Sequence, residues 1–370
     1  MKVICNRGAL LEALNITGNV VAARTPKPVL LCVRLAASAN ELTISATDLE
    51  VAIVYRDAQV EVGQVGEIVV PADKMRDIVR ECIDDTLTIE LVDDMAHVKG
   101  QNSFFKIYTQ QADAFPPIPG VEGKPDFDIQ GKQLKLLISQ TIFAAAREAT
   151  RYAFNGILLA VKGKRVSFVG TDGRRLAEAR GDLISGGGAT EKDGPRAIIP
   201  TKALSLIDKL VDDPEESVSF QIKENQIVVS TPRATLTSTL IEGQFPPYED
   251  VVPKDTDRKV TAATNDLLGA VRQAALLTTD ESKGVKMSFS KKGLVLSSSS
   301  PGSGEATVNF PCKLEGADIE MGFNPAFVIE ALRAAGTDEV TLEMTAPNRP
   351  GLIRGGPNFL CVVMPVNLTA

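Results

Sequence analysis

Over most of the chain, apolar and polar residues alternate in short runs that end at turn residues, a pattern typical of half-buried β-strands. One such run ends at Thr47, a second at Thr171, and a degenerate third at Ser299. The first two threonines are 124 residues apart, and Ser299 follows 128 residues later. This near-equal spacing predicts a structural unit that occurs three times along the chain.

Each of the three repeats also carries two segments with the spacing of an amphipathic helix. These segments predict six helices, over residues 7–21, 72–82, 131–147, 201–212, 265–276 and 325–334. In the third helix, Leu134, Leu137 and Ile138 fall on one face at the i, i+3, i+4 spacing. The sixth begins with Asn324 as N-cap and Pro325 at the first helical position, which is a standard start signal.

Connectors divide the chain between these units. A Phe-Pro step occurs at Phe115 and again 130 residues later at Phe245. The segments 116–125 and 253–258 are Pro-rich or charged, as linkers often are. We therefore expect three similar domains, at residues 1–122, 123–256 and 257–370. Each would be of the α+β class, with two helices on one face of antiparallel sheets.

The composition places the chain among soluble globular proteins. Apolar residues make up 44% and charged residues 24% of the 370 residues. No apolar run approaches the ~18 residues of a membrane helix, and the N-terminal segment has no apolar signal region. The five cysteines include no CxxC pair, which fits a reducing compartment. We expect a cytoplasmic protein without a membrane segment.

Candidate catalytic chemistry is sparse. The chain has a single histidine, His97, which lies in a predicted strand. Because HExxH zinc sites and most other histidine metal sites need more than one histidine, this count excludes them. The chain has no phosphate-binding P-loop and no GxSxG nucleophile motif. The glycines at 186–188 suit a loop better than a phosphate cradle. The sequence contains no positive sign of an enzyme, and no cofactor or metal is expected.

The position of the charges changes what the net charge of −7 implies. The six predicted helices carry eleven Lys and Arg against eight Asp and Glu, so the helices are mildly basic and the remainder is acidic. Lys202 and Lys209 share one helix face. If all six helices face one way, that side would attract phosphates weakly. Ordinary solvated helices would give the same pattern.

Taken together and in order, several motifs resemble the family of bacterial sliding clamps, the β subunits of DNA polymerase III, over the whole chain. The resemblance is carried by Thr47-Asp48-Leu49-Glu50, Ala114-Phe115-Pro116, Arg151-Tyr152-Ala153-Phe154-Asn155-Gly156, Thr171-Asp172-Gly173-Arg174-Arg175-Leu176-Ala177, Phe245-Pro246-Pro247-Tyr248, Gly322-Phe323-Asn324 and Val362-Val363-Met364-Pro365. It implies three clamp domains and a head-to-tail homodimer closed into a ring. The ring would encircle double-stranded DNA without reading its sequence and tether the replicative polymerase, with no catalysis of its own.

The resemblance also implies functional residues. A pocket between the second and third domains would bind short peptides of polymerase and clamp-loader subunits. Its residues would be Arg151, Phe154, Thr171, Gly173, Arg174, Arg175, Leu176, Pro246, Val251, Asn324, Phe327, Val362, Val363, Met364 and Pro365. DNA would be contacted by Arg24, Tyr152 and Lys202, and the dimer interface would include Phe105, Ile107, Leu276 and Leu277. Without the resemblance, residues 362–364 would be interpreted as a plain final strand.

Two other interpretations remain open at this point. A scaffold of repeated domains would bind peptides but form no ring-shaped dimer. A hydrolase would use paired carboxylates such as Asp48 and Glu50, and it would need a buried acidic cleft that raises a carboxyl pKa.

Overall fold

The computed structural model describes residues 1–22, 24–57, 59–120, 123–147, 152–187, 194–279 and 284–367. The chain forms two compact units. Unit 1 consists of Met1–Lys132, Leu183–Gly186 and Lys202–Leu240, and unit 2 of Gln133–Asp182, Gly187–Thr201 and Ile241–Ala370. Within the described ranges, no helix combines the length and the apolar character that crossing a bilayer requires.

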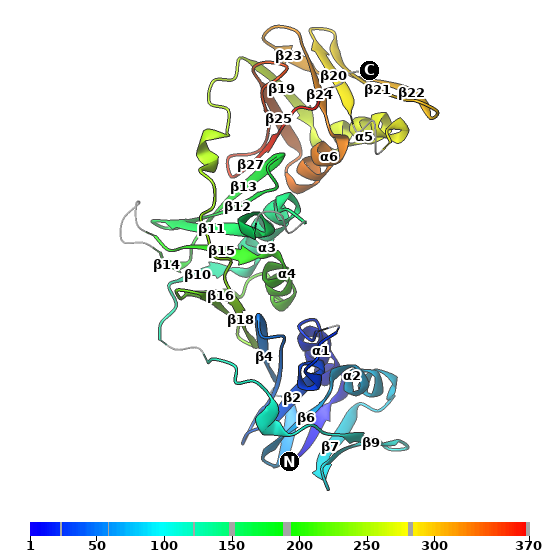
Figure 1. Ribbon diagram of the computed structural model, residues 1–370, viewed down its shortest axis with the longest axis vertical. Coiled ribbons are helices and arrows are strands. Elements are labelled where there is room, and N and C mark those ends of the chain that lie inside the picture. The colour runs from blue at the N-terminus through cyan, green and yellow to red at the C-terminus, as the bar shows by residue number, and fades with distance from the viewer. Residues whose placement is uncertain are drawn as a thin grey trace. The chain divides into compact units, whose positions relative to one another are not determined.

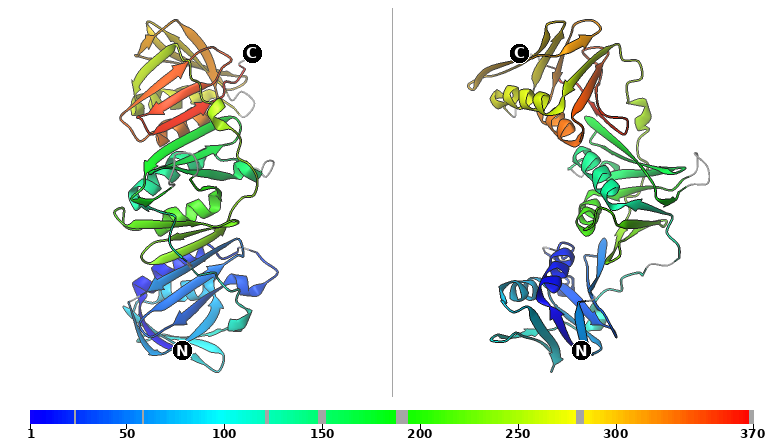
Figure 2. Two further views of the ribbon diagram at one scale, coloured as in Figure 1. Left: turned by 90° about the vertical axis from the view of Figure 1, so that its left-hand side faces the viewer. Right: turned by 180° about the vertical axis from the view of Figure 1, so that it is seen from behind.

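Unit 1 contains two antiparallel sheets, with strand orders β5-β1-β7-β8-β9 and β14-β10-β16-β17-β18-β4-β3-β2-β6. The strands are β1 Lys2–Asn6, β2 Cys32–Ala37, β3 Leu42–Thr47, β4 Val51–Asp57, β5 Val60–Gln64, β6 Gly66–Pro71, β7 Thr86–Val92, β8 Met95–Lys99, β9 Phe104–Tyr108, β10 Phe127–Gln130, β14 Ser185–Gly186, β16 Ser217–Ile222, β17 Gln226–Ser230 and β18 Ala234–Thr239. The helices α1 (Arg7–Gly18), α2 (Ala72–Glu81) and α4 (Thr201–Leu210) lie on one side of the nine-stranded sheet (Figures 1 and 2).

Unit 2 has the same plan, with strand orders β15-β11-β12-β13-β27-β26-β25-β19-β23 and β22-β21-β20-β24. Its strands are β11 Gly156–Lys162, β12 Arg165–Thr171, β13 Arg175–Asp182, β15 Arg196–Pro200, β19 Arg258–Ala263, β20 Val285–Ser290, β21 Gly293–Ser300, β22 Gly304–Phe310, β23 Lys313–Glu315, β24 Ile319–Phe323, β25 Glu339–Met344, β26 Gly351–Gly355 and β27 Phe359–Val363. Its helices are most of α3 (Gly131–Thr141), α5 (Thr264–Ala274) and α6 (Pro325–Ala334).

The nine-stranded sheets run through the predicted domain junctions. In unit 1, β4 of the first predicted domain pairs with β18 of the second. In unit 2, β13 of the second pairs with β27 of the third. Main-chain hydrogen bonds therefore join neighbouring domains, and the division into two units falls inside the central segment. The domain borders at 122/123 and 256/257 stay a prediction.

The helices begin where the sequence predicts. The Asn6 side chain accepts a hydrogen bond from the Ala9 N–H, and that of Asn324 from the Ala326 N–H, so both residues act as N-caps. The predicted apolar face of α3 is buried at Leu134 and Leu137. This helix ends at residue 141 rather than at 147, because a 3₁₀ turn over residues 142–144 follows it.

Two turns of the repeat have the same geometry. In the β3–β4 turn, the Thr47 hydroxyl donates to the Val51 carbonyl at 3.0 Å and accepts the Leu49 N–H at 3.0 Å. The β12–β13 turn makes the same bonds around Thr171, at 2.7 and 3.1 Å. The third position has φ of 81° at Leu49 and 82° at Gly173. The first two copies of the repeat predicted from sequence therefore share the geometry of this turn.

Candidate functional site

A pocket of about 140 Å³ lies in unit 2 where β13, the end of β27 and the 3₁₀ turn Tyr248–Asp250 meet. Its walls are formed by Phe154, Thr171, Gly173, Arg175, Leu176, Pro246, Tyr248, Val251, Val362 and Met364. All but Tyr248 are residues that the resemblance assigned to a peptide pocket. Segments far apart in the sequence are brought together here, which is common at ligand sites.

The β12–β13 turn shapes one wall of the pocket. The Asp172 carboxylate accepts the backbone N–H groups of Arg174 and Arg175, at 2.9 and 3.0 Å, and so fixes the turn. Gly173 sits at its exposed tip with φ of 82°, a conformation that favours glycine. The first residues of β13 pair with β27, which places Leu176 opposite Val362. Leu176 is 3% exposed and packs with Val362 in an apolar cluster.

Arg175 supports the pocket from behind rather than offering a free charge to it. Its side chain is 6% exposed and pairs with Asp172 at 3.1 Å and with Glu330. It also donates to the Phe143 carbonyl, and its guanidinium lies 4.5 Å from the centre of the Phe327 ring. Each guanidinium nitrogen of Arg175 therefore already has a protein partner, so this lining residue holds the pocket together.

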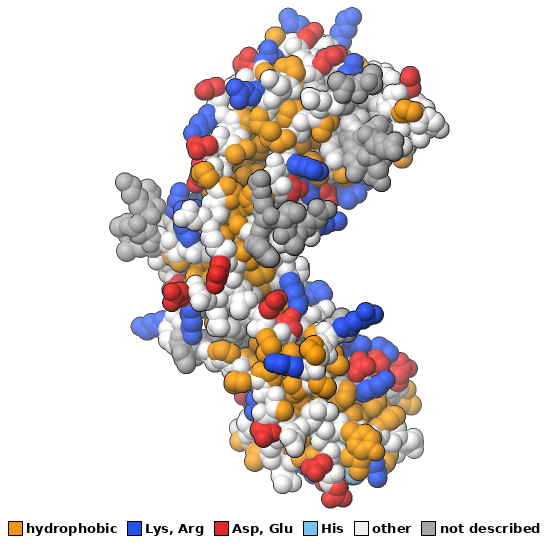
Figure 3. Space-filling model, in the orientation of Figure 1, with side chains coloured by type: hydrophobic (Ala, Val, Ile, Leu, Met, Phe, Trp, Pro, Cys, Tyr) orange, Lys and Arg blue, Asp and Glu red, His pale blue; other side chains and the backbone are white. Residues whose placement is uncertain are grey.

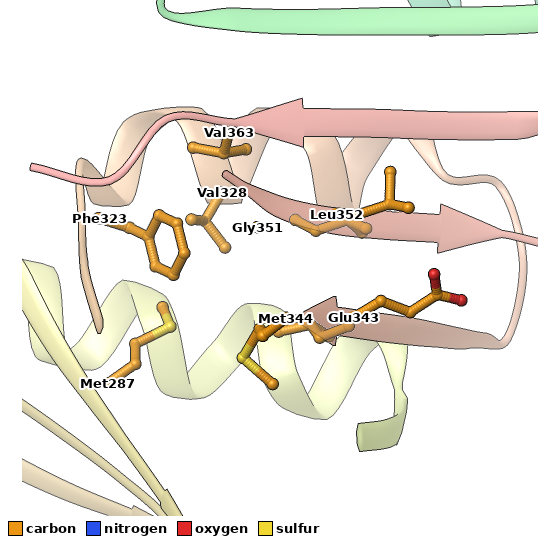
Figure 4. A pocket seen from close by; sticks show the side chains of 10 residues that line it. Met287, Phe323, Val328, Glu343, Met344, Gly351, Leu352 and Val363 are labelled. Atoms are coloured by element: carbon orange, nitrogen blue, oxygen red, sulfur yellow. The ribbon is translucent and has the colours of Figure 1, made fainter. Parts of the chain in front are cut away.

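Strand alternation divides the C-terminal residues between two faces of β27. Val362 and Met364 line the pocket, and Met364 is 38% exposed. Val363 points the other way, into a small apolar cavity with Phe323 and Val328 (Figure 4). Its assignment to the pocket surface is corrected for this reason, since consecutive strand residues face opposite sides.

The remaining predicted pocket residues lie around the pocket without lining it. Arg174 is exposed, and its carbonyl accepts the Met364 N–H at 2.9 Å, which holds the end of the chain beside the turn. Asn324 caps α6, and Phe327 stacks on Arg175. Pro365 is half-buried. Arg151 lies outside the described residues.

Tyr248 is a pocket residue that was quoted in a motif but not assigned to the site. It is 6% exposed, and burial raises the pKa of its hydroxyl to about 12. The signal was its place two residues after Pro246 in the Phe-Pro step. The Tyr248 hydroxyl stays protonated near neutral pH, so it brings no charge to the apolar wall.

The residues assigned to DNA have different surroundings. Arg24 is exposed. Tyr152 begins the 3₁₀ turn Tyr152–Asn155. Lys202, in the first turn of α4, forms an ion pair with Asp48 of the β3–β4 turn, and both lie in unit 1. Asp48 also accepts two backbone N–H groups, so its carboxylate holds a turn and a lysine, which does not support the hydrolase interpretation.

The residues assigned to the dimer interface are not equally exposed. Phe105 is half-buried and Ile107 is only 7% exposed, because both point to the inner face of edge strand β9. Leu276, in the 3₁₀ turn Ala275–Leu277, is 78% exposed, and Leu277 is half-buried. Ile107 therefore packs largely within its own sheet, and its place in the dimer interface stays a prediction.

Family models cover nearly the whole chain. The N-terminal domain of the DNA polymerase III β subunit matches residues 1–119, the central domain 128–247, and the C-terminal domain 249–367. The chain belongs to the DNA polymerase III β subunit family. This confirms three clamp domains of the α+β class and the sliding-clamp interpretation, in preference to a peptide scaffold that does not encircle DNA.

Curated relatives and solved structures agree with the family. The Beta sliding clamps of Pseudomonas putida and Vibrio cholerae are 33% and 30% identical, over 98% and 100% of both chains. The Pseudomonas aeruginosa β subunit superposes with a TM-score of 0.92 at 31% identity, covering 100% of both chains. The Bacillus subtilis sliding clamp gives 0.94 at 26% identity over 99% of both chains. A P. aeruginosa clamp has also been solved bound to griselimycin, with a TM-score of 0.94, 31% identity and full coverage of both chains.

Proposed function

We propose that two copies of this chain close head to tail into a ring around duplex DNA and tether the replicative polymerase and clamp-loader subunits through short peptides. The observation that carries the peptide part of the proposal is the pocket where β13, the end of β27 and the 3₁₀ turn Tyr248–Asp250 meet, in a chain of the sliding-clamp family. The clamp would act in the bacterial cytoplasm without catalysing a reaction itself and without a cofactor.

We propose that the ring closes by the same antiparallel strand pairing that joins neighbouring domains within the chain. Within each unit, antiparallel strands pair across a predicted domain junction. β9 and β22 are edge strands of the two shorter sheets, and edge strands present unpaired main-chain groups. We propose that β9 of one copy pairs with β22 of the other, twice in a dimer, and that Phe105, Ile107, Leu276 and Leu277 pack beneath these pairs.

We propose that the closed ring is retained on DNA because it encircles the duplex, and not because it binds the duplex strongly. A closed ring stays on DNA while its contacts to phosphate exchange, so these contacts are best kept weak. Figure 3 shows basic and acidic side chains interspersed over the coloured part of the face in view, in a chain with a net charge of −7. Arg24, Tyr152 and Lys202 are the proposed contact residues.

The pocket has the chemistry of a groove for short apolar anchors. Leu176, Pro246 and Val362 supply apolar surface, and the flexible thioether of Met364 adapts to different partners. The exposed backbone at Gly173 allows close approach of a peptide main chain. We propose that partners insert extended segments with a Gln near the start and Leu-Phe-like residues near the end, and that a few anchors carry most of the binding energy.

Met364→Ala tests the shared pocket. We expect it to weaken binding of the polymerase and of the clamp-loader subunit alike, by roughly tenfold, because a common anchor contact is lost. The measurement is competition against one labelled peptide of the proposed pattern, followed by fluorescence anisotropy. Met95→Ala, a half-buried methionine in β8 of unit 1, is the matched control. Saturating peptide that leaves both partners bound at full strength contradicts a shared pocket.

A further inference from the structure

Lys202, a proposed DNA contact, is already paired with a carboxylate. Its ammonium group forms an ion pair with Asp48, a residue 154 positions away in the sequence and in the same unit. The lysine side chain is 49% exposed, whereas that of Asp48 is only 10% exposed. The pair therefore presents the cation to solvent and keeps the acid beneath it.

The turn holds Asp48 in place. One carboxylate oxygen accepts the N–H groups of Glu50 and Val51, at 3.0 and 2.8 Å, and the other accepts the Lys202 ammonium. The equivalent residue of the second domain, Asp172, uses its second oxygen for buried Arg175 instead. The two turns thus use this aspartate differently: in unit 1 it pairs with Lys202 of α4, and in unit 2 it pairs with an arginine of its own turn.

Lys209, on the same face of α4 as Lys202, offers an internal comparison. Its ammonium donates to the side-chain oxygen of Asn19 at 2.9 Å. An amide orients this lysine without cancelling its charge, whereas the Asp48 carboxylate offsets the charge of Lys202. Two lysines seven residues apart are therefore held by the first domain, one with its charge offset and one without.

We infer that Asp48 is a positioning residue that sets how strongly Lys202 attracts DNA phosphate. The inference rests on the proposed function. A lysine ammonium has three donors, so Lys202 keeps donors for phosphate while one is used by Asp48. The fixed negative charge beside it repels the same phosphate, so the contact is oriented but weak. Such a contact suits a ring that must move along DNA.

Asp48→Asn tests the inference, because the amide oxygen of asparagine can accept the same two backbone N–H groups and keep the turn. We expect tighter direct binding of the free clamp to duplex DNA, by roughly five- to tenfold at ~0.1 M salt. The plot of log affinity against log salt should steepen by about 0.9, the value for one added phosphate contact. Fluorescence anisotropy over a salt series measures both quantities.

Matched variants separate electrostatics from folding. Glu67→Gln changes the net charge by the same amount, but the acid that it removes pairs with Arg34, which is not a proposed DNA contact. The salt slope of this variant should therefore stay as in the wild type. Lys202→Gln should change binding little in the wild type and abolish the gain in Asp48→Asn. An unchanged slope in Asp48→Asn, with only a lower melting temperature, overturns the inference and leaves Asp48 a purely structural residue.

Retention on closed circular DNA distinguishes this inference from the function on which it rests. Loaded wild-type clamps that stay on circular DNA and slip off after linearisation support the ring. With that result, an unchanged salt slope in Asp48→Asn overturns only the role of Asp48. Wild-type clamps that leave circular and linear DNA equally fast overturn both proposals.

Discussion

Arg175 follows the pocket turn directly in sequence, yet its guanidinium lies against the rings of Phe143 and Phe327, at 5.2 and 4.5 Å from their centres. Its partners Asp172 and Glu330 come from the turn and from α6. A buried ion pair of this kind is costly to break from one side, since the remaining charge loses its partner. The pocket therefore depends on side chains that hold its wall in place as well as on those that a peptide would touch.

Asp57 carries a pH-dependent cost to stability. It is 4% exposed, its Oδ1 accepts the Gln59 N–H at 2.8 Å, and its Oδ2 has no hydrogen-bond partner among the described residues. Burial, and to a lesser extent the charge of Glu12, raises the pKa of this carboxyl above its usual 3.8. The native state therefore binds the proton more tightly than the unfolded state, and its stability falls as pH rises through the raised pKa.

We predict that Asp57→Asn raises the free energy of unfolding at pH 7 by about 1 kcal/mol, because a neutral amide avoids burying a charge. The gain should shrink towards zero below pH 4, where the wild-type carboxyl is protonated in both states. Urea unfolding at a series of pH values measures it. Glu224→Gln, at an exposed position, is the control. A gain that is the same at pH 4 and pH 7 would contradict the titration of Asp57.

At the element scale, the two repeated turns differ at the position with positive φ. Gly173 adopts φ of 82° without a side chain to clash, whereas Leu49 adopts φ of 81° with a leucine that is 53% exposed. Left-handed backbone costs a non-glycine residue roughly 1–2 kcal/mol. The hydrogen bonds of Thr47 and Asp48 hold the turn in spite of this strain.

Leu49→Gly should therefore stabilise the protein. We predict a rise of about 1 kcal/mol in the free energy of unfolding, since the relief of strain exceeds the added entropy of the unfolded chain. Gly173→Ala, the matched change in the other turn, should destabilise. Calorimetric melting compares the two variants with the wild type. A melting temperature lowered by Leu49→Gly would show that the packing of the leucine side chain stabilises the protein by more than the strain of its left-handed backbone costs.

At the scale of the whole molecule, the structure decides which variant can test the dimer. Ile107 is 7% exposed within its own subunit, so an aspartate there would unfold the first domain and confuse the result. Leu276 is 78% exposed and tolerates a charge in the isolated subunit. Only the second residue separates assembly from folding.

We predict that Leu276→Asp weakens the dimer roughly a hundredfold or more, because each of two interfaces loses a buried leucine worth about 2 kcal/mol. Sedimentation at micromolar concentration should show monomers, with an unchanged circular dichroism spectrum. Ile83→Asp, at a residue 90% exposed and outside the proposed interface, should leave the mass of the dimer intact. A Leu276→Asp variant that still sediments as a dimer would exclude this interface.

Local signals made much of the fold predictable from sequence. All six predicted helices are present in the described residues, and a side chain caps the start of two of them, α1 at Asn6 and α6 at Asn324. The strand that carries His97 follows the alternation that predicted it. The length of α3 was overestimated, because its apolar spacing continues into a 3₁₀ turn where the hydrogen-bond pattern changes.

The threefold repeat, the types of the elements and the family could be predicted from the sequence alone, because each depends on residues close together or on motifs in a set order. Which side chains share a site follows from the packing of distant segments and needed the folded structure. Val363 differs from Val362 because one face of β27 meets the pocket and the other the core. Lys202 is paired because the fold brings Asp48 to it across 154 residues. Such contacts depend on how distant strands and helices pack, which no local pattern encodes.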